Sequence, residues 1–265
     1  MSGAPLLSME DVTLAFYGVR ALDGVSLTVD AGSLVAVIGP NGAGKTSLFN
    51  CISRIYRPQR GKVMFDGHDV STLATHDAAH HGIARTFQNL ALFENLSVLD
   101  NLLVGRHHLV RTHFWQHMLS SPAAVRSEVA HRRRVEEIID FLDLERYRKT
   151  PAIVLPYGVR KRVELGRALA MEPRLLLLDE PAAGLNQEET EDMARYVLDI
   201  KEELGITQLL IEHHLGFVLD LADRVAVLNF GRKIADGVPA EIERDPRVVA
   251  AYIGGSTQQR AEAQP

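Results

Sequence analysis

One eight-residue segment constrains this chain more than any other, because it places glycines and a lysine at a spacing that binds phosphate. It fits the pattern G-x-x-x-x-G-K-[ST] at every fixed position and consists of Gly39, Pro40, Asn41, Gly42, Ala43, Gly44, Lys45 and Thr46. An apolar run at 34–38 precedes it, and a helix-like run begins at Ser47. The glycines let several backbone N–H groups converge, and the helix N-terminus behind them adds partial positive charge. We therefore predict that this segment, through Ser47, binds a nucleoside triphosphate.

Two side chains of this P-loop have expected roles. Lys45 would reach the β- and γ-phosphates, and the hydroxyl of Thr46 would hold Mg²⁺. The alternative is a glycine-rich turn that merely joins a strand to a helix. The filled pattern and the two flanking runs favour phosphate binding.

The composition fits a globular protein and argues against a general nucleic-acid binder. The 265 residues suit one large domain, or a domain with a subdomain, and 46% of them are hydrophobic. The net charge is −5, with acidic and basic residues mixed along the chain, so we expect no nucleic-acid partner. The single cysteine, Cys51, excludes an internal disulfide, and its helical spacing with Leu48 and Ile52 predicts a core residue.

No segment has the pattern of a membrane span or a signal peptide. No apolar run approaches the roughly 20 residues that cross a bilayer, and no positive charge precedes an apolar segment near the N-terminus. We expect a cytoplasmic protein, which is compatible with docking on a membrane protein. The small and polar residues at 254–265 predict a flexible tail.

The order of apolar patterns predicts an α/β core with an inserted helical part. Alternation at 12–16 and 25–29 predicts strands, and three continuous apolar runs predict parallel strands buried on both faces, at 175–178, 208–211 and 225–228. Helices at 188–204 and 215–222 complete a doubly wound pattern. Between them, Leu96, Leu99, Leu102 and Leu103, and then Val135, Ile138, Ile139 and Leu142, recur at helical spacing.

We divide the chain accordingly. A single domain covers 6–253, with an α/β core at 6–88 and 167–240, a helical subdomain at about 89–166, a C-terminal segment at 241–253 and the tail at 254–265.

Two acidic residues follow the first of the continuous apolar runs. Asp179 and Glu180 stand where a buried parallel strand ends, which is where α/β folds bind ligands. Asp179 is placed to hold Mg²⁺ through water, and Glu180 to polarise the water that attacks the γ-phosphate. The alternative is a pair of carboxylates that face solvent.

Four further features follow in a fixed order. They are Gln88 within Arg85-Thr86-Phe87-Gln88-Asn89, the segment Leu155-Pro156-Tyr157-Gly158-Val159, the segment Ala183-Gly184-Leu185-Asn186, and His213 after Leu210-Ile211-Glu212. With the P-loop and the acidic pair, they make the chain resemble the ATP-binding subunits of ABC transporters over nearly its whole length.

The resemblance implies a fold, cofactors and roles. It implies a P-loop NTPase of the ABC type, with antiparallel strands near the N-terminus, that uses ATP and Mg²⁺. Gln88 would link Mg²⁺ to the helical subdomain, His213 would contact the γ-phosphate, and Glu180 would be catalytic. The signature residues Pro156, Tyr157 and Gly158 would contact the ATP held by a second ATPase subunit in a head-to-tail dimer.

An aromatic residue is expected to stack on the adenine. Phe16 fits this position best by register, with Tyr17 as the second candidate. The alternative for Phe16 is a core residue on the face of Val12 and Leu14.

Several segments are similar to one branch of the family, the importer ATPases for branched-chain and other hydrophobic amino acids. These are the signature with its Tyr157-Gly158 pair, the segments 181–186 and 92–98, an insertion at 107–133 and the ending at 245–254. Val159, His214 and Tyr17 depart from the residues usual in this branch.

The resemblance therefore implies an importer ATPase for branched-chain or related amino acids. It would lie on the inner face of the cell membrane, with a second ATPase subunit (itself or a sister chain), two permeases and, indirectly, a solute-binding protein. The alternatives are uptake of urea, amides or another small solute, export of lipid or lipopolysaccharide, and a non-transport ATPase that acts on ribosomes or DNA.

Two other patterns have open interpretations. Histidines at 76, 80, 81, 107, 108, 113 and 117 suggest a metal, but they lack partners at ligand spacing, so a solvated helix face is favoured. Phe114-Trp115 would either anchor a partner or fill a small core of the insertion.

Overall fold

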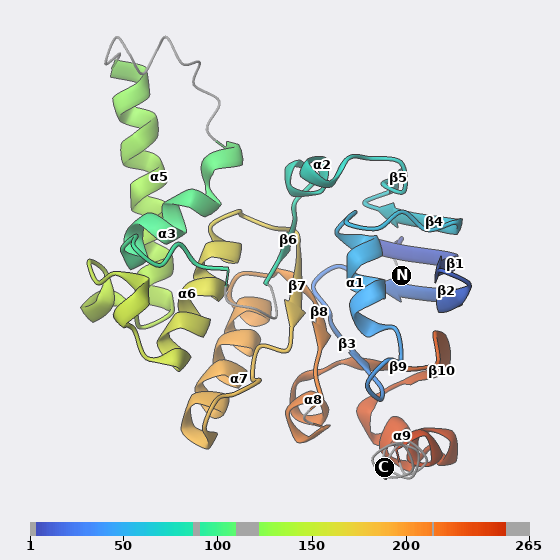
Figure 1. Ribbon diagram of the computed structural model, residues 1–265. Helices are drawn as coiled ribbons and strands as arrows, with labels where there is room; N and C mark the ends of the chain where they lie inside the picture. The colour runs from blue at the N-terminus through green and yellow to red at the C-terminus, as the bar shows by residue number, and fades with distance from the viewer. Residues whose placement is uncertain (1–3, 87–90, 110–121, 214, 253–265) are drawn as a thin grey trace.

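Two sheets and a group of helices make up the protein (Figure 1). The computed structural model describes residues 4–86, 91–109, 122–213 and 215–252. The smaller sheet is antiparallel, in the order β2 (Val19–Val29), β1 (Leu7–Phe16), β4 (Arg60–Phe65) and β5 (His68–Asp69). The larger sheet has the order β10 (Arg232–Gly237), β9 (Arg224–Asn229), β3 (Leu34–Ile38), β8 (Thr207–Ile211), β7 (Leu175–Asp179) and β6 (Ile83–Arg85). Its strands are parallel except for β10 at one edge.

The helices connect and cover these sheets. They are α1 (Lys45–Ile52), α2 (Thr75–His80), α3 (Val98–Gly105), α5 (Pro122–Phe141), α6 (Tyr157–Leu169), α7 (Gln187–Glu202), α8 (Leu215–Leu221) and α9 (Pro239–Arg244). Short 3-10 turns lie at His107–Leu109, Glu145–Tyr147 and Ala152–Val154. In the part of the chain that the structure describes, no helix is both long enough and apolar enough to cross a membrane.

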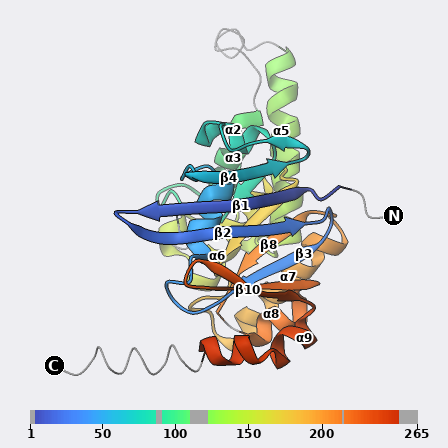
Figure 2. The same cartoon turned by 90° about the vertical axis from the view of Figure 1, so that its right-hand side faces the viewer.

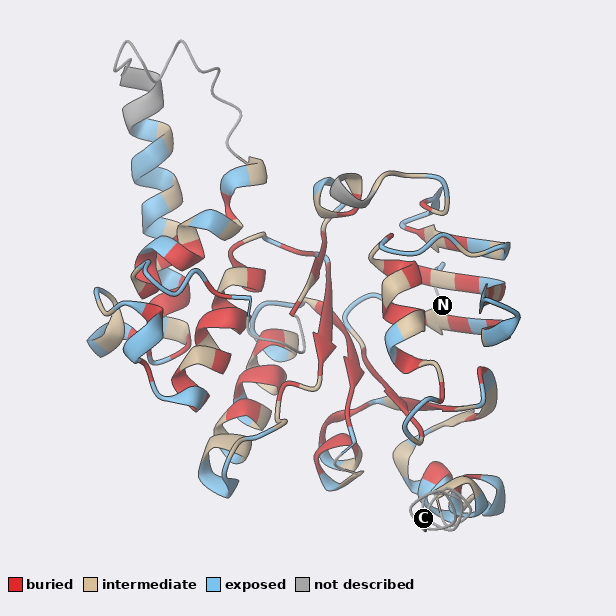
Figure 3. Ribbon diagram, viewed as in Figure 1, coloured by how far each residue is buried: buried red, intermediate tan, exposed pale blue. Residues whose placement is uncertain are grey.

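The larger sheet separates two hydrophobic cores. Along β7, Leu175 and Leu177 belong to the core shared with α1 and the antiparallel sheet, whereas Leu176 and Leu178 belong to the core shared with the other helices. All four are fully buried, and Figure 3 shows the central strands buried along their length. The predicted strands buried on both faces are thereby confirmed, and so is the α/β fold class.

Cys51 lies in the first of these cores, as its spacing predicts. It is fully buried on α1, between the two sheets. Burial raises the pKa of its thiol to about 11, with the charge of Arg54 acting in the opposite direction. At neutral pH the thiol is therefore protonated and is a packing group rather than a nucleophile.

Helices α3, α5 and α6 pack against one another, and α5 projects beyond the rest of the molecule (Figures 1 and 2). The apolar residues at 135, 138, 139 and 142 are buried against α3 and α6, as their helical spacing predicts. Leu96 differs from the prediction, because α3 begins only at Val98 and Leu96 is partly exposed before it. Ser97 stops the helix there: its hydroxyl accepts a hydrogen bond from the backbone N–H of Asp100 at 3.1 Å.

Truncating the sheet core should destabilise the protein strongly. Leu176 is fully buried and packs in the core on the helical side of the larger sheet. We expect Leu176→Ala to lower the free energy of unfolding by about 2–5 kcal/mol, because it leaves a cavity that the sheet cannot close. Urea unfolding followed by circular dichroism measures this, with the exposed Val19→Ala as the matched control. Equal midpoints for the two variants would contradict the assigned core.

Candidate functional site

The P-loop is the turn between β3 and α1. The chain leaves β3 after Ile38 and enters α1 at Lys45, as the sequence pattern requires. Gly39 and Gly44 have φ values of 149° and 104°, and a Cβ atom at either would overlap a backbone carbonyl oxygen, of Leu228 and Ala21 respectively. The loop is therefore pressed against β9 and β2, which only glycine permits at these two positions.

Lys45 lies inside the loop. Its ammonium donates hydrogen bonds to the carbonyl oxygens of Gly39 at 2.7 Å and Pro40 at 3.0 Å. Burial lowers the pKa of this ammonium, and the charges of Glu180 and Asp179 act in the opposite direction. The lysine thus places a desolvated positive charge at the mouth of the loop, where it interacts more strongly with an anion than it would in water.

A cleft of about 780 Å³ lies over the P-loop. It is lined by Ala21, Asn41, Gly42, Ala43, Gly44, Lys45, Thr46, Ser47, Glu180 and His213. The fold therefore gathers three segments that are far apart in the sequence, because β3, β7 and β8 are neighbouring parallel strands that end at the same edge.

Asp179 is the last residue of β7 and is buried. Its side chain is 1% exposed, which rules out the alternative of a carboxylate facing solvent. Its Oδ2 atom accepts a hydrogen bond from Arg85 Nη2 at 2.6 Å, and its backbone N–H donates to Thr86 Oγ1 at 3.2 Å. Its Oδ1 atom is buried and has no hydrogen-bond partner among the residues that the structure describes.

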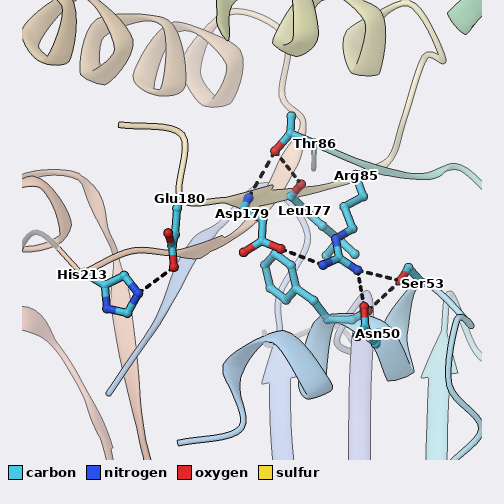
Figure 4. Close-up of polar contacts among 9 residues, drawn as sticks. Asn50, Ser53, Arg85, Thr86, Leu177, Asp179, Glu180 and His213 are labelled. Atoms are coloured by element: carbon cyan, nitrogen blue, oxygen red, sulfur yellow. Dashed lines mark hydrogen bonds and ion pairs between the residues drawn. The ribbon is translucent and has the colours of Figure 1, made fainter. Parts of the chain in front are cut away.

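Glu180 and His213 form a pair at the cleft. Nε2 of His213 lies 2.6 Å from Oε1 of Glu180, as Figure 4 shows. Glu180 has a φ of 52°, and its backbone N–H donates to the carbonyl oxygen of Ile211 at 2.9 Å, the last residue of β8. This turn brings the carboxylate out of the sheet and against the histidine that follows the next strand.

The signature segment begins α6, with Pro156 as the residue before the helix. Tyr157 is partly exposed, and its hydroxyl donates to the carbonyl oxygen of Ala183 at 3.3 Å. Gly158 packs so closely on Glu189 that a Cβ atom would overlap its carboxylate. None of Pro156, Tyr157 and Gly158 lines the cleft over the P-loop.

Lys161 connects the same helix to the acidic pair. It is buried, and its ammonium donates to the backbone carbonyl oxygen of Glu180 at 3.2 Å. The sequence motifs did not indicate this contact, because it joins a residue after the signature to a backbone atom.

The two aromatic candidates lie at the end of β1. Phe16 is 38% exposed and contacts Tyr56 edge-on, with ring centroids 5.0 Å apart, so it is not part of the core that holds Val12 and Leu14. Tyr17 follows with a φ of 49° and is fully exposed. Both aromatic rings are accessible to a ligand.

Some predicted residues lie outside the described part of the chain. These are Gln88, His214, Phe114 and Trp115, the histidines at 113 and 117, and the tail at 254–265. Among the residues that the structure does describe, no three His, Cys, Asp or Glu side chains are close enough to hold a metal ion together. His108 is half-buried and contacts the carbonyl oxygen of Gly105 at 3.2 Å, and its ring lies edge-on to that of His80.

Sequence reasoning missed the contact that Arg85 makes with Asp179. It quoted this arginine only as part of the segment around Gln88, whereas the structure places its guanidinium on Asp179 (Figure 4). Its only sequence signal is a charge directly after the two apolar residues Ile83 and Ala84, which by itself identifies no partner.

A methyl group at Gly39 should weaken nucleotide binding. In Gly39→Ala the Cβ atom meets the backbone of Leu228, so the loop has to leave its position and its N–H groups no longer converge. We expect MgATP affinity, measured by calorimetry, to fall at least tenfold. Gly32→Ala is the matched control, since it also has a positive φ but open space around the added Cβ atom. Wild-type affinity in Gly39→Ala would show that the loop geometry does not limit binding.

Comparison with known proteins agrees with this geometry. Residues 22–183 match the family model described as ABC transporter, and residues 232–257 match that described as branched-chain amino acid ATP-binding cassette transporter. The high-affinity branched-chain amino acid transport ATP-binding protein BraF of Pseudomonas aeruginosa is 38% identical, over 94% of this chain and 98% of its own. Its counterpart LivG of Escherichia coli K12 is 35% identical over the same shares of the two chains.

Solved structures show the same fold. The ADP conformation of an ATP-binding cassette of an ABC transporter superposes with a TM-score of 0.83, at 34% identity, and covers 95% of this chain and 100% of its own. A nucleotide-free cassette gives a TM-score of 0.81 at 32% identity and covers 94% and 98%. The resemblance predicted from the motifs is confirmed: this chain belongs to the ABC transporter family, as an ATP-binding cassette of the kind that hydrolyses ATP to drive transport.

Proposed function

We propose that this cassette energises the uptake of branched-chain or related amino acids. The observation that carries the proposal is that one cleft joins the P-loop to Glu180 and His213, in a chain whose relatives BraF and LivG are named for branched-chain amino acid transport. Residues 232–257 lie outside the 22–183 match and fit the branched-chain cassette model, so they support the proposal independently.

The phosphates of ATP fit the P-loop. Its backbone N–H groups and the N-terminus of α1 would hold the β- and γ-phosphates, with Lys45 supplying positive charge between them. Phe16 or Tyr17 would stack on the adenine, since both rings are exposed.

The acidic side of the cleft fits Mg²⁺. The buried Oδ1 atom of Asp179 lacks a hydrogen-bond partner among the described residues, and Thr46 lines the cleft with its hydroxyl. Carboxylate and hydroxyl oxygens are the donors that this hard cation prefers. Thr46, Asp179 and Gln88 would hold the ion, which neutralises charge on the β- and γ-phosphates when it is bound.

Hydrolysis would depend on Glu180 and His213. The carboxylate of Glu180 would orient a water molecule and accept its proton as the water oxygen bonds to the γ-phosphorus and the bond to ADP breaks. The imidazole of His213, held at 2.6 Å from Glu180, would fix that carboxylate and contact the γ-phosphate.

A second ATPase subunit would complete each site. The signature residues lie away from the cleft over their own P-loop, while the uncapped N-terminus of α6 offers N–H groups to an anion. A head-to-tail dimer would bring Pro156, Tyr157 and Gly158 of each chain to the ATP of the other. The partner is either a second copy of this chain or a sister ATPase.

An exposed apolar surface would bind the membrane subunits. We call Phe93, Leu96, Ile153 and Val154 the docking patch, because all four are exposed although they come from two distant segments. Backbone hydrogen bonds join these segments, from Ile153 to Glu94 and from Ala152 to Leu96, each at 3.0 Å. Exposed apolar groups of this kind mark interaction sites.

An alternative function is lipopolysaccharide export. The export ATPase LptB of Haemophilus influenzae is 30% identical over 94% of this chain, which is lower than the identity to BraF. A pull-down of the tagged chain from detergent-solubilised membranes distinguishes the two. Two permeases with an amino-acid-binding protein would support import, and a lipid-export scaffold without a binding protein would overturn it.

Replacing Glu180 should stop turnover but not binding. We expect Glu180→Gln to lower the rate of phosphate release at least 100-fold, because an amide cannot accept the proton of the attacking water. The affinity for MgATP should stay at the wild-type level. Glu188→Gln, an exposed change in the first turn of α7, is the control. Retained turnover in Glu180→Gln would remove Glu180 from its proposed role.

Charges in the docking patch should separate the cassette from its membrane partners. We expect Phe93→Asp with Val154→Asp to abolish co-purification of the permeases, because both side chains are more than half exposed and an aspartate is costly to bury in an interface. ATP binding should persist. Val249→Asp, at an exposed valine of the C-terminal segment, is the control. Co-purification at the wild-type level would place the membrane contact elsewhere.

A further inference from the structure

Arg85 connects the acidic strand to the P-loop helix. It is the last residue of β6, and its side chain is only 8% exposed. One nitrogen, Nη2, donates to Oδ2 of Asp179 at 2.6 Å, and the other, Nη1, donates to Oδ1 of Asn50 at 2.6 Å and to Oγ of Ser53 at 3.3 Å. The guanidinium thus joins three elements, β6, β7 and α1, as Figure 4 shows.

These contacts connect Arg85 to two expected Mg²⁺ ligands, Asp179 directly and Thr46 through helix α1. Asn50 lies on the same helix that begins with Lys45 and Thr46. Asp179 is held on the other branch of the guanidinium fork. Because that fork is planar and rigid, it fixes the separation between the carboxylate and the helix that presents Thr46.

The hydrogen bonds also set the orientation of the carboxylate. Arg85 occupies Oδ2 of Asp179 and leaves Oδ1 without a hydrogen-bond partner among the described residues. The backbone of Asp179 is fixed in the same region by Thr86, whose hydroxyl oxygen accepts from its N–H group. One carboxylate oxygen is thereby held by the protein, and the other, buried next to the cleft-lining Glu180, has no hydrogen-bond partner among the described residues.

The ring of Phe49 completes the enclosure. The guanidinium carbon of Arg85 lies 5.5 Å from the centroid of this ring, which is fully buried. The ring shields the guanidinium from water, which strengthens its hydrogen bonds to Asp179 and Asn50.

We infer that Arg85 is a positioning residue for Mg²⁺, acting through Asp179 and α1. Arg85 does not line the cleft over the P-loop. Outer groups that orient metal ligands typically change metal affinity by about 10–100-fold when they are removed. The inference rests on the proposed role of Asp179 as an Mg²⁺ ligand.

The test compares nucleotide binding with and without the ion, in the full chain. Calorimetry with a non-hydrolysable ATP analogue gives one affinity in EDTA and one in saturating Mg²⁺, and their ratio is the Mg²⁺ enhancement. We expect Arg85→Met to lower this enhancement at least tenfold while the affinity in EDTA stays unchanged. A role in stability alone would lower the melting temperature without changing the enhancement in the folded fraction.

Two variants serve as references. Arg174→Met removes another arginine–aspartate pair, with Asp66, but both members of that pair are about half exposed and lie away from the cleft. It should leave the enhancement at the wild-type value. Asp179→Asn should abolish the enhancement, and adding Arg85→Met to Asp179→Asn should change nothing further, because the arginine acts through the carboxylate.

The outcomes distinguish the inference from the proposed function. Full enhancement in Asp179→Asn would remove Asp179 from the Mg²⁺ site, and the inference would fail with it. Loss in Asp179→Asn with full enhancement in Arg85→Met would overturn the inference alone.

Arg85→Lys keeps the test decisive if Arg85→Met does not fold. Lysine retains the buried charge, but its ammonium ends one bond short of the guanidinium nitrogens and has no fork to join Asp179 with Asn50. We expect a partial loss of the enhancement in this variant. An unchanged enhancement in Arg85→Lys would overturn the inference.

Discussion

Burial of the larger sheet on both faces is the constraint on which the nucleotide site depends. The central strands β3, β7, β8 and β9 alternate their side chains between two cores, so these side chains are mostly apolar. The buried Gln208 of β8 donates to the carbonyl oxygen of Val197, and the charged groups near the P-loop lie beyond the apolar parts of these strands. Because β3, β7 and β8 are parallel neighbours, their carboxyl ends bring the P-loop, the acidic pair and His213 to one edge.

At that edge, each carboxylate lies next to a basic side chain. Lys45 lies in the P-loop, Asp179 is paired with Arg85, and Glu180 is paired with His213. Each carboxylate thus has a different partner. The two residues are adjacent in sequence, but their side chains differ in exposure. Asp179 is enclosed, whereas Glu180 lines the open cleft. This difference suits a carboxylate that holds a cation beside one that handles a proton.

The sequence predicted the features that depend on local pattern. The four leucines of β7 and the acidic pair after them specify a buried strand and its functional end, and the glycines at 39 and 44 specify the loop. Short elements escaped prediction, because β5 has two residues and β6 three, too few to show a period. Leu96 fitted the helical spacing of its neighbours by chance, and only the hydroxyl of Ser97 decides where the helix begins.

Contacts between distant segments were beyond the reach of sequence patterns. Arg85 and Asp179 are 94 residues apart, and the docking patch combines two segments that each look unremarkable alone. A pattern gives the residue type and the local element, but the partner of a buried charge depends on which strands become neighbours. The pairing of β6 with β7 brings Arg85 opposite Leu177, two residues before the aspartate, and so decides this partner.

Helix α6, which begins at the signature segment, contacts the chain that follows the acidic pair. Tyr157 contacts the carbonyl of Ala183, Gly158 packs on Glu189, and Lys161 donates to the carbonyl of Glu180. Glu189 in turn is fixed by the cap of α7, where Asn186 accepts from its N–H group at 2.9 Å. Because α6 also packs against α3 and α5, a displacement of these helices would move the helix that donates a hydrogen bond to the backbone of Glu180. In the proposed dimer, an ATP molecule bound to the signature of one chain would therefore contact the same helix that holds the backbone of Glu180 in that chain, which would link the two sites through α6 as well as through the nucleotide.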